Sequence, residues 1–420
     1  MGKYTLHTDP RVDAIVESHL AQICECTLRH FRPEALLLSG SFGRGEGSVS
    51  LDGGQVRFYS DYEVSLISSR PSARLAIDPI QREINAKLPL SVSIFWTTPR
   101  KLRHNLSRNL SFGPPYLSIG VYELKAGSQV FYGDFDLSAN QNDPRDLPVS
   151  EGVRLIANRM MEAIEKWWRT PKSPDLGTRT PKSPDLGTQT PKSGDFGLRE
   201  RSELAFSLSK LVLACGDALL LKNGHYHYSY AERGRRFSQH YDELFRPLLG
   251  CEFFTLYEQA SSFKLRPDAE VQPAAILEAL PQIRACCWTT LRHLLDLPED
   301  DTDRVFAAMA ASMPITYQTG LSNSLDVAYE DLILWLRGRR AGKKTWPNNR
   351  TPGLSLTMFQ RLYGAIPSLF WGLPMEGQAD ARLLQASREW GAWAFPPQAR
   401  PAVPEQQLVP VLLSMWHAFG

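Results

Sequence analysis

Two neighbouring stretches decide how the first third of this chain folds: LLLSGSFGRGEGSV, residues 36–49, and YSDYEVSLI, residues 59–67. The first stretch begins as an apolar run that stops at Gly40, as a buried strand does before a tight turn. Glycine permits an unusual φ and close approach of the backbone, so the amides and the hydroxyl of Gly40 and Ser41 can face an anion. A helix opening near Phe42 would add its partial positive charge. The pattern therefore predicts a phosphate-binding turn.

The second stretch carries two acidic residues two positions apart, Asp61 and Glu63. In a strand, such residues leave the same face about 7 Å apart. Mg²⁺ is commonly held by one or two carboxylates together with waters and substrate phosphates. We therefore predict a Mg²⁺ site at Asp61 and Glu63, with Arg44 pairing with phosphate oxygens. The alternative is that both acids belong to the solvated side of a half-exposed strand.

The segments around these motifs predict a small mixed sheet with flanking helices. Helical spacing of apolar residues and a start signal at Asp9-Pro10 favour a helix over residues 11–30, and a second helix is expected over 73–87. Short runs rich in β-branched and aromatic residues predict strands over 35–38, 58–67, 90–96, 116–124 and 129–132.

From residue 150 onward the pattern is mainly helical, so the expected fold class is α+β: a small mixed-sheet domain followed by a mainly α-helical region. Helices are predicted over 151–168, 200–222, 276–295, 325–336 and 355–369. A ten-residue unit rich in Pro, Gly, Ser and Thr is written three times in residues 169–198, and a period this short favours a disordered insertion. The expected domains are 1–145, 150–300 with that insertion, and 301–420.

Composition limits the kinds of partner and the location that we expect for this protein. The 420 residues include 47 basic and 45 acidic side chains, and a net charge of +2 gives no indication of bulk DNA binding. The six cysteines lack the spacing of zinc ligands, which favours reduced thiols. The longest apolar run, residues 211–221, is shorter than the roughly 20 residues of a membrane span. With no apolar leader at the start, we expect a cytoplasmic protein without a membrane segment.

GSFGRGE followed by SDYE resembles the Gly-Ser and Asp-x-Asp/Glu signature of the DNA polymerase β-like nucleotidyltransferase superfamily, in particular its minimal and antibiotic-modifying branches. The resemblance implies a transferase that moves a nucleoside monophosphate from an NTP, expected to be ATP, to a hydroxyl acceptor, with Mg²⁺. The acceptor could be a small molecule, a protein or an RNA end. Catalytic and metal-binding roles then fall on Asp61 and Glu63. Nucleotide binding falls on Gly40, Ser41, Arg44 and, in the helical part, Lys210.

Two features leave alternatives open. Active members of that superfamily usually carry a third carboxylate on a neighbouring strand, where this chain has Ser91 and Ser93; Glu123 is a candidate substitute. The alternative function is therefore a catalytically weak or inactive nucleotide-binding or antitoxin-like protein of the same fold. The Arg-x4-His spacing of Arg235 and His240 resembles the ribonuclease motif of HEPN domains, which gives a third hypothesis of RNA cleavage.

Overall fold

The fold is described from a computed structural model, which defines residues 2–52, 55–104, 117–137, 142–169, 196–267, 273–298, 301–313, 357–375, 379–391 and 405–419. Its N-terminal part holds a four-stranded mixed sheet with strand order β5-β4-β1-β6. Strand β1 pairs antiparallel with β4 and β6, and β5 pairs parallel with β4. The strands of this sheet are β1 (Ala35–Ser39), β4 (Tyr62–Ile67), β5 (Val92–Thr97) and β6 (Gln129–Gly133).

Both faces of the sheet are covered because the side chains of β1 alternate between two apolar clusters. Leu36 and Leu38 pack with α1 and α3, whereas Ala35 and Leu37 face a cluster that includes Leu102. This alternation is the period of two expected for a buried strand. The helices of this part are α1 (Pro10–His30), α2 (Gly40–Gly43), α3 (Ala73–Asn85), α4 (Pro99–Arg103) and α5 (Ile119–Gly127).

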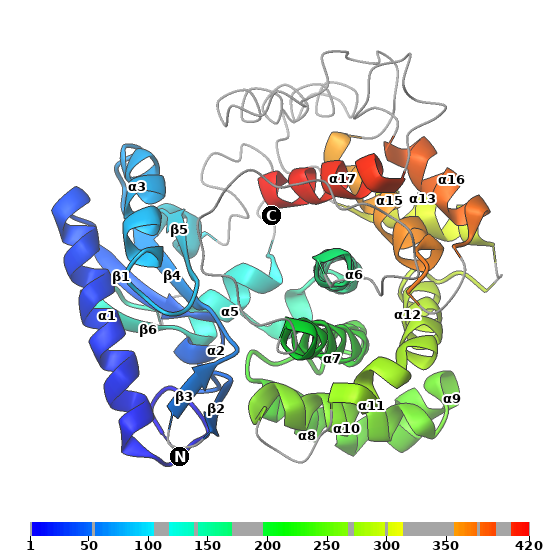
Figure 1. Cartoon of the computed structure of the whole chain (residues 1–420), viewed down its shortest axis with the longest axis horizontal. Coiled ribbons are helices and arrows are strands. Elements are labelled where there is room, and N and C mark those ends of the chain that lie inside the picture. The colour runs from blue at the N-terminus through cyan, green and yellow to red at the C-terminus, as the bar shows by residue number, and fades with distance from the viewer. Residues whose placement is uncertain are drawn as a thin grey trace.

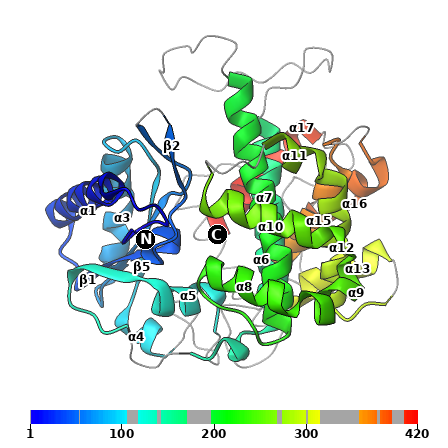
Figure 2. The same cartoon turned by 90° about the horizontal axis from the view of Figure 1, so that it is seen from below.

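A separate two-stranded hairpin, β2 (Val49–Asp52) and β3 (Gln55–Phe58), lies between the turn after β1 and the start of β4. The turn, the hairpin and the acidic pair are therefore continuous in the chain. In Figures 1 and 2 the sheet and its helices form one body, and the helices from α6 onward form a second body beside it.

The second body is a helical bundle around α6 and α7, which lie at its centre in Figure 1. One apolar cluster runs from Val153 on α6 to Met415 on α17. Its elements are η1 (Pro144–Asp146), α6 (Val149–Arg169), α7 (Phe196–Lys222), α8 (Tyr230–His240), η2 (Tyr241–Phe245), α9 (Arg246–Leu249), α10 (Glu252–Leu265), α11 (Pro273–Glu278), α12 (Leu280–Leu294), α13 (Thr302–Ser312), α15 (Met358–Gly372), α16 (Ala381–Gly391) and α17 (Glu405–Phe419).

Among the described residues one helical segment, Arg201–Lys222, is long and apolar enough to cross a membrane by length and composition. Because 94% of its most apolar window is buried inside the protein, the same segment also fits a core helix. The six cysteines are free thiols, as expected, and four of them are buried.

The α+β class with a helical remainder is confirmed, and three local predictions are corrected. Residues 116–124 were expected to form a strand, but α5 occupies most of this segment because Ser118 caps its N-terminus and Ile119 and Tyr122 share one buried face. The strand expected over 58–67 is divided between β3 and β4, and the helix expected over 276–295 is divided between α11 and α12. The helix predicted over 325–336 and nearly all of the repeat tract lie outside the described residues.

Candidate functional site

The turn after β1 lies directly against the second acidic residue. Ser39, the last residue of β1, is the register partner of Glu63 on β4, and its hydroxyl donates a hydrogen bond to the Glu63 carbonyl at 3.0 Å. Gly40 follows with φ +66°, a left-handed conformation that glycine adopts without strain. A Cβ at Gly40 would lie 2.7 Å from Glu63 Oε1, so only glycine leaves room for the carboxylate. The predicted turn and acid therefore meet, with Ser41 next in the chain.

Asp61 lies just before β4 and Glu63 is its second residue, so the two acids flank Tyr62. Tyr62 between them is fully buried in the opposite direction, whereas Asp61 is exposed and Glu63 is half-buried. Burial and the charge of Asp61 raise the pKa of Glu63. Within the described part of the chain, neither carboxylate forms an ion pair or accepts a hydrogen bond. Two adjacent carboxylates without protein partners are a place where a cation would be stabilised.

Two cationic side chains of the bundle, Arg159 and Lys264, lie within electrostatic reach of these acids, and Lys210 is linked to Arg159 through a shared carboxylate. Lys210 on α7 forms an ion pair with Glu162 at 2.7 Å, and the same carboxylate pairs with Arg159 on α6 at 2.6 Å. The amines of Lys210 and Lys264 stand 5.2 and 5.3 Å from the centre of the Phe206 ring. The charges of Arg44 and, more weakly, of Arg159 oppose the rise in the pKa of Glu63, so both arginines lie within electrostatic reach of this carboxylate.

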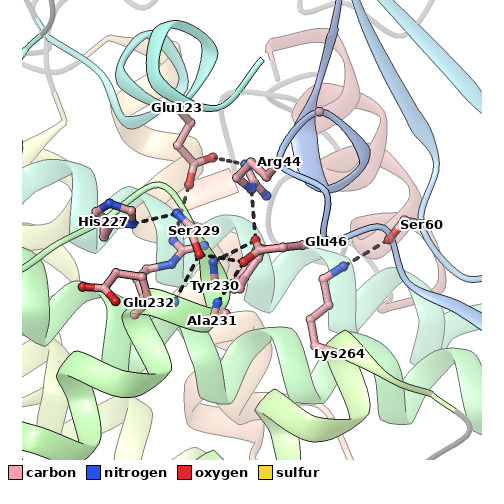
Figure 3. A network of polar contacts seen from close by, with 12 residues as sticks. Arg44, Glu46, Ser60, Glu123, His227, Ser229, Tyr230, Ala231, Glu232 and Lys264 are labelled. Carbon is pink, nitrogen blue, oxygen red and sulfur yellow. Dashed lines mark hydrogen bonds and ion pairs between the residues drawn. The ribbon is translucent and has the colours of Figure 1, made fainter. Parts of the chain in front are cut away.

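Arg44 and Glu46, in the second half of the glycine-rich stretch, connect the sheet to the bundle (Figure 3). Glu46 is buried and accepts hydrogen bonds from Ser229 Oγ at 2.7 Å, Tyr230 N at 2.9 Å and Ala231 N at 3.0 Å, which are donors at the start of α8. A carboxylate at a helix N-terminus is stabilised by the unsatisfied amides and the helix dipole. The glycine-rich stretch therefore also holds the two bodies together.

Arg44, predicted to pair with phosphate, is surrounded by protein carboxylates. Its side chain is 5% exposed and pairs with Glu123 at 3.2 Å and with Glu46 at 3.6 Å. These carboxylates raise the pKa of Arg44 despite its burial, so the charge is permanent. Its role as a phosphate ligand stays a prediction, and in this structure its partners are two glutamates.

The place where a third acid is expected holds a serine. Ser93 on β5 is the register partner of Glu63, and Ser91 lies just before β5. Glu123, the candidate substitute, accepts a hydrogen bond from Tyr226 at 2.7 Å and also pairs with Arg233 at 3.4 Å. Burial would raise the pKa of Glu123, but Arg44 and Arg233 outweigh it and lower that pKa. Glu123 is near enough to raise the pKa of Glu63, yet its charge is compensated by arginines.

The Arg-x4-His pair lies elsewhere on the bundle. Arg235 is exposed and pairs with Glu232 at 2.7 Å, and His240 stacks on His225 with ring centres 4.0 Å apart. Arg233, on the same helix, is fully buried and pairs with Asp217 at 3.0 Å. Among the described residues no contact joins Arg235 to His240, and the ribonuclease hypothesis stays a prediction.

The acidic pair fits Mg²⁺ as a partial ligand set. In the described portion of the chain no cluster of three or more His, Cys, Asp or Glu side chains could hold a metal. A cation at Asp61 and Glu63 would need further oxygens from water or phosphate, which is how Mg²⁺ is usually bound beside nucleotides. Among the residues that the structure describes, none forms an ion pair or hydrogen bond with either carboxylate, so the two acids fit the ion that the resemblance implies.

Two hollows of the bundle lie apart from these residues. One, of about 430 Å³, is lined by Trp288, Trp371, Phe306 and Arg284 among others. The other, of about 270 Å³, is lined by residues of α9, α10 and α12, including Cys251. Neither includes a residue of the acidic pair, so we do not assign them to the chemistry of Asp61 and Glu63.

Comparison with family models, curated protein sequences and solved structures finds no match to this chain. The site therefore has to be judged on its own geometry.

Two cations near the acids were missed in the sequence: Arg159 and Lys264. Both lie in helices that mix apolar and polar residues. In such a helix the sequence does not distinguish a buried basic residue from an exposed one. The buried state of Lys264, 3% exposed, depends on which surface its helix covers. No local pattern in the sequence carries that signal.

Proposed function

We propose that this protein is a Mg²⁺-dependent nucleotidyltransferase that moves a nucleoside monophosphate from an NTP, expected to be ATP, to a hydroxyl acceptor. The observation that carries the proposal is the contact between the left-handed turn at Gly40 and the carboxylate of Glu63, which forms no hydrogen bond or ion pair with any residue that the structure describes. Asp61 extends the same acidic edge, and Lys210 and Arg159 supply positive charge nearby. Carboxylates for a cation and cations for phosphate are together what this chemistry needs.

Each residue has a defined task in the proposed reaction. The acceptor oxygen forms a bond to the α-phosphorus while the bond from that phosphorus to the bridging oxygen breaks; pyrophosphate leaves and the hydroxyl proton passes to water. Mg²⁺, when bound, neutralises phosphate charge and makes the acceptor oxygen a better nucleophile. Asp61 and Glu63 hold the ion, and the backbone at Gly40 and Ser41 orients the triphosphate. Lys210 attracts the charged phosphates.

The test is incubation of the full chain with labelled ATP and Mg²⁺, with pyrophosphate release as the readout. Asp61→Ala should lower the rate about 100-fold or more, because a bound metal contributes several kcal/mol to the transition state. Asp242→Ala, which removes an exposed acid on the bundle, should leave the rate unchanged. Absence of nucleotide-dependent product from the wild-type protein, with small-molecule, protein and RNA acceptors supplied in turn, contradicts the proposal.

A second candidate function is nucleotide binding without turnover, as in an antitoxin-like or sensing protein. The observation in its favour is that Ser93 stands opposite Glu63 and that Glu123 is taken up by Arg44 and Arg233. ATP with Mg²⁺ would then stabilise the fold, by about 2.7 kcal/mol at a ligand concentration 100 times the Kd. Thermal stabilisation without pyrophosphate release in any acceptor mixture would select this function over the first.

A further inference from the structure

Lys264, near the end of α10, joins the bundle to the sheet body by contacts that the proposed chemistry does not use. It is 3% exposed, and its Nζ donates hydrogen bonds to Ser48 Oγ at 2.6 Å and to Ser60 Oγ at 3.1 Å. Figure 3 shows the contact with Ser60. The hydroxyl of Ser48 in turn donates to the carbonyl oxygen of Lys264. A single residue of the bundle thus binds two serines that lie 216 and 204 positions away in the chain.

These serines close the base of the β2–β3 hairpin. Ser48 directly precedes β2, and its amide donates to Ser60 Oγ at 3.2 Å. The amides of Tyr59 and Ser60 both donate to the Ser48 carbonyl, at 2.9 and 3.3 Å. Asp61 is the next residue after Ser60 and lies just before β4. The amine of Lys264 is therefore bound to the residue that immediately precedes the first acid.

Lys264 contacts the hairpin base through hydrogen bonds, and its amine also lies within electrostatic reach of Asp61. In the part of the chain that the structure describes, its hydrogen-bond acceptors are hydroxyls and it has no carboxylate partner. Burial, followed by the charges of Lys210, Arg44 and Arg159, lowers the pKa of Lys264, and the charge of Asp61 partly opposes this. An apolar side chain of similar length would avoid the cost of burying an amine, so what lysine supplies here is the pair of hydrogen bonds to the hairpin base, together with an electrostatic interaction with Asp61.

We propose that Lys264 is a positioning residue that fixes Asp61 through the Ser48 and Ser60 hydroxyls, so that the acidic pair takes its metal-binding geometry only when the bundle is docked on the hairpin. This inference rests on the proposed function for its consequence, since it assigns the acids to a metal. The inference also predicts that Lys264 makes the base of the β2–β3 hairpin more rigid, and this can be measured without metal or nucleotide.

The first measurement is hydrogen exchange of the full chain. Lys264→Met, which keeps the length of the side chain and removes the donor, should speed exchange of the Tyr59 and Ser60 amides. Lys222→Met is the matched control, because the Lys222 amine also donates two hydrogen bonds, but to the His293 carbonyl and the Asp296 carboxylate instead of to the hairpin. Unchanged exchange at Tyr59 and Ser60 in the Lys264 variant overturns the inference, whatever the protein does with nucleotides.

The second measurement is Mn²⁺ binding, followed by electron paramagnetic resonance without nucleotide. Loss of a group that orients metal ligands typically costs about 10- to 100-fold in affinity. We expect that loss of Mn²⁺ affinity in Lys264→Met and in Ser60→Ala. The double variant should bind Mn²⁺ no more weakly than the single variant that has the lower affinity. In the transferase assay the rate of Lys264→Met should recover partly at high Mg²⁺, an effect that simple destabilisation of the fold does not produce.

The outcomes separate the two proposals. Wild-type Mn²⁺ binding with unchanged affinity in Lys264→Met overturns the positioning role and leaves the proposed function intact. No Mn²⁺ binding and no nucleotide-dependent product in the wild type overturns the proposed function, while the exchange experiment still decides whether Lys264 orders the hairpin base.

Discussion

Replacing Gly40 with alanine is the sharpest single test of the turn. Two effects add: the left-handed φ of +66° costs a non-glycine residue about 1–2 kcal/mol, and the new Cβ would lie 2.7 Å from Glu63 Oε1 and 2.8 Å from its Cδ. Ordinary contact starts at 3.4 Å, so the carboxylate has to retreat by the difference, about 0.7 Å. Because a displacement of 1 Å at a reacting group can cost about 100-fold, we expect activity to fall tens of fold.

The control for Gly40→Ala is Gly224→Ala. Gly224 also has a positive φ, of 74°, but a Cβ there would meet only the exposed side chain of Arg145, at 3.2 Å. Urea unfolding should show a loss of stability of about 1–2 kcal/mol for the control, and at least that for Gly40→Ala. Only Gly40→Ala should lose stabilisation by ATP with Mg²⁺ and pyrophosphate release. Wild-type activity in a folded Gly40→Ala protein would refute the contact between turn and acid as the basis of the site.

Two further predictions concern carboxylates with several protein partners: Glu162 within the bundle, and Glu46 between the sheet and the bundle. Burial tends to raise the pKa of Glu162, but Lys210 and Arg159 outweigh it and lower that pKa from 4.5 to about 2. A lowered folded-state pKa contributes stability above pH 4.5 that is lost as the pH falls toward 2. In urea unfolding, the stability advantage of the wild type over Glu162→Gln should therefore shrink across that window. Parallel curves of stability against pH for the two proteins would contradict this. Glu46→Ala leaves three donors at the start of α8 without their acceptor and should lower the free energy of unfolding by at least about 2 kcal/mol in the same assay. The control, Glu232→Ala, removes surface ion pairs and should cost less than about 1 kcal/mol. Equal losses would show that Glu46 stabilises the protein no more than a surface ion pair does.

The strand, the turn and the acidic edge could be predicted because each depends on residues close together in the chain. The apolar run of β1 ends where Gly40 permits a positive φ, and the i, i+2 spacing puts Asp61 and Glu63 on either side of the buried Tyr62 at the start of β4. The serine opposite Glu63 was also foreseeable, since Ser91 and Ser93 share one face of the neighbouring strand.

The segment around Glu123 shows where local patterns mislead. Its β-branched and aromatic residues favour a strand, yet the Ser118 cap and the burial of Ile119 and Tyr122 against Leu221 and Tyr226 of the bundle make it a helix. The preference of a short apolar run is weak, so packing against another body decides its conformation. The same packing turns Glu123 toward Arg44 and Arg233, which no spacing in the sequence indicates.

The sequence by itself therefore determined the α+β class, the left-handed turn and the paired acids, because these follow from backbone conformation and short-range periodicity. Only the tertiary structure decided which charges remain without partners. Arg44 and Glu46 are engaged between the two bodies, Lys210 is shared with Glu162, and Lys264 reaches across 216 positions to Ser48. Ion pairing and burial depend on distances between segments far apart in the chain, and those distances exist only once the bundle has packed against the sheet.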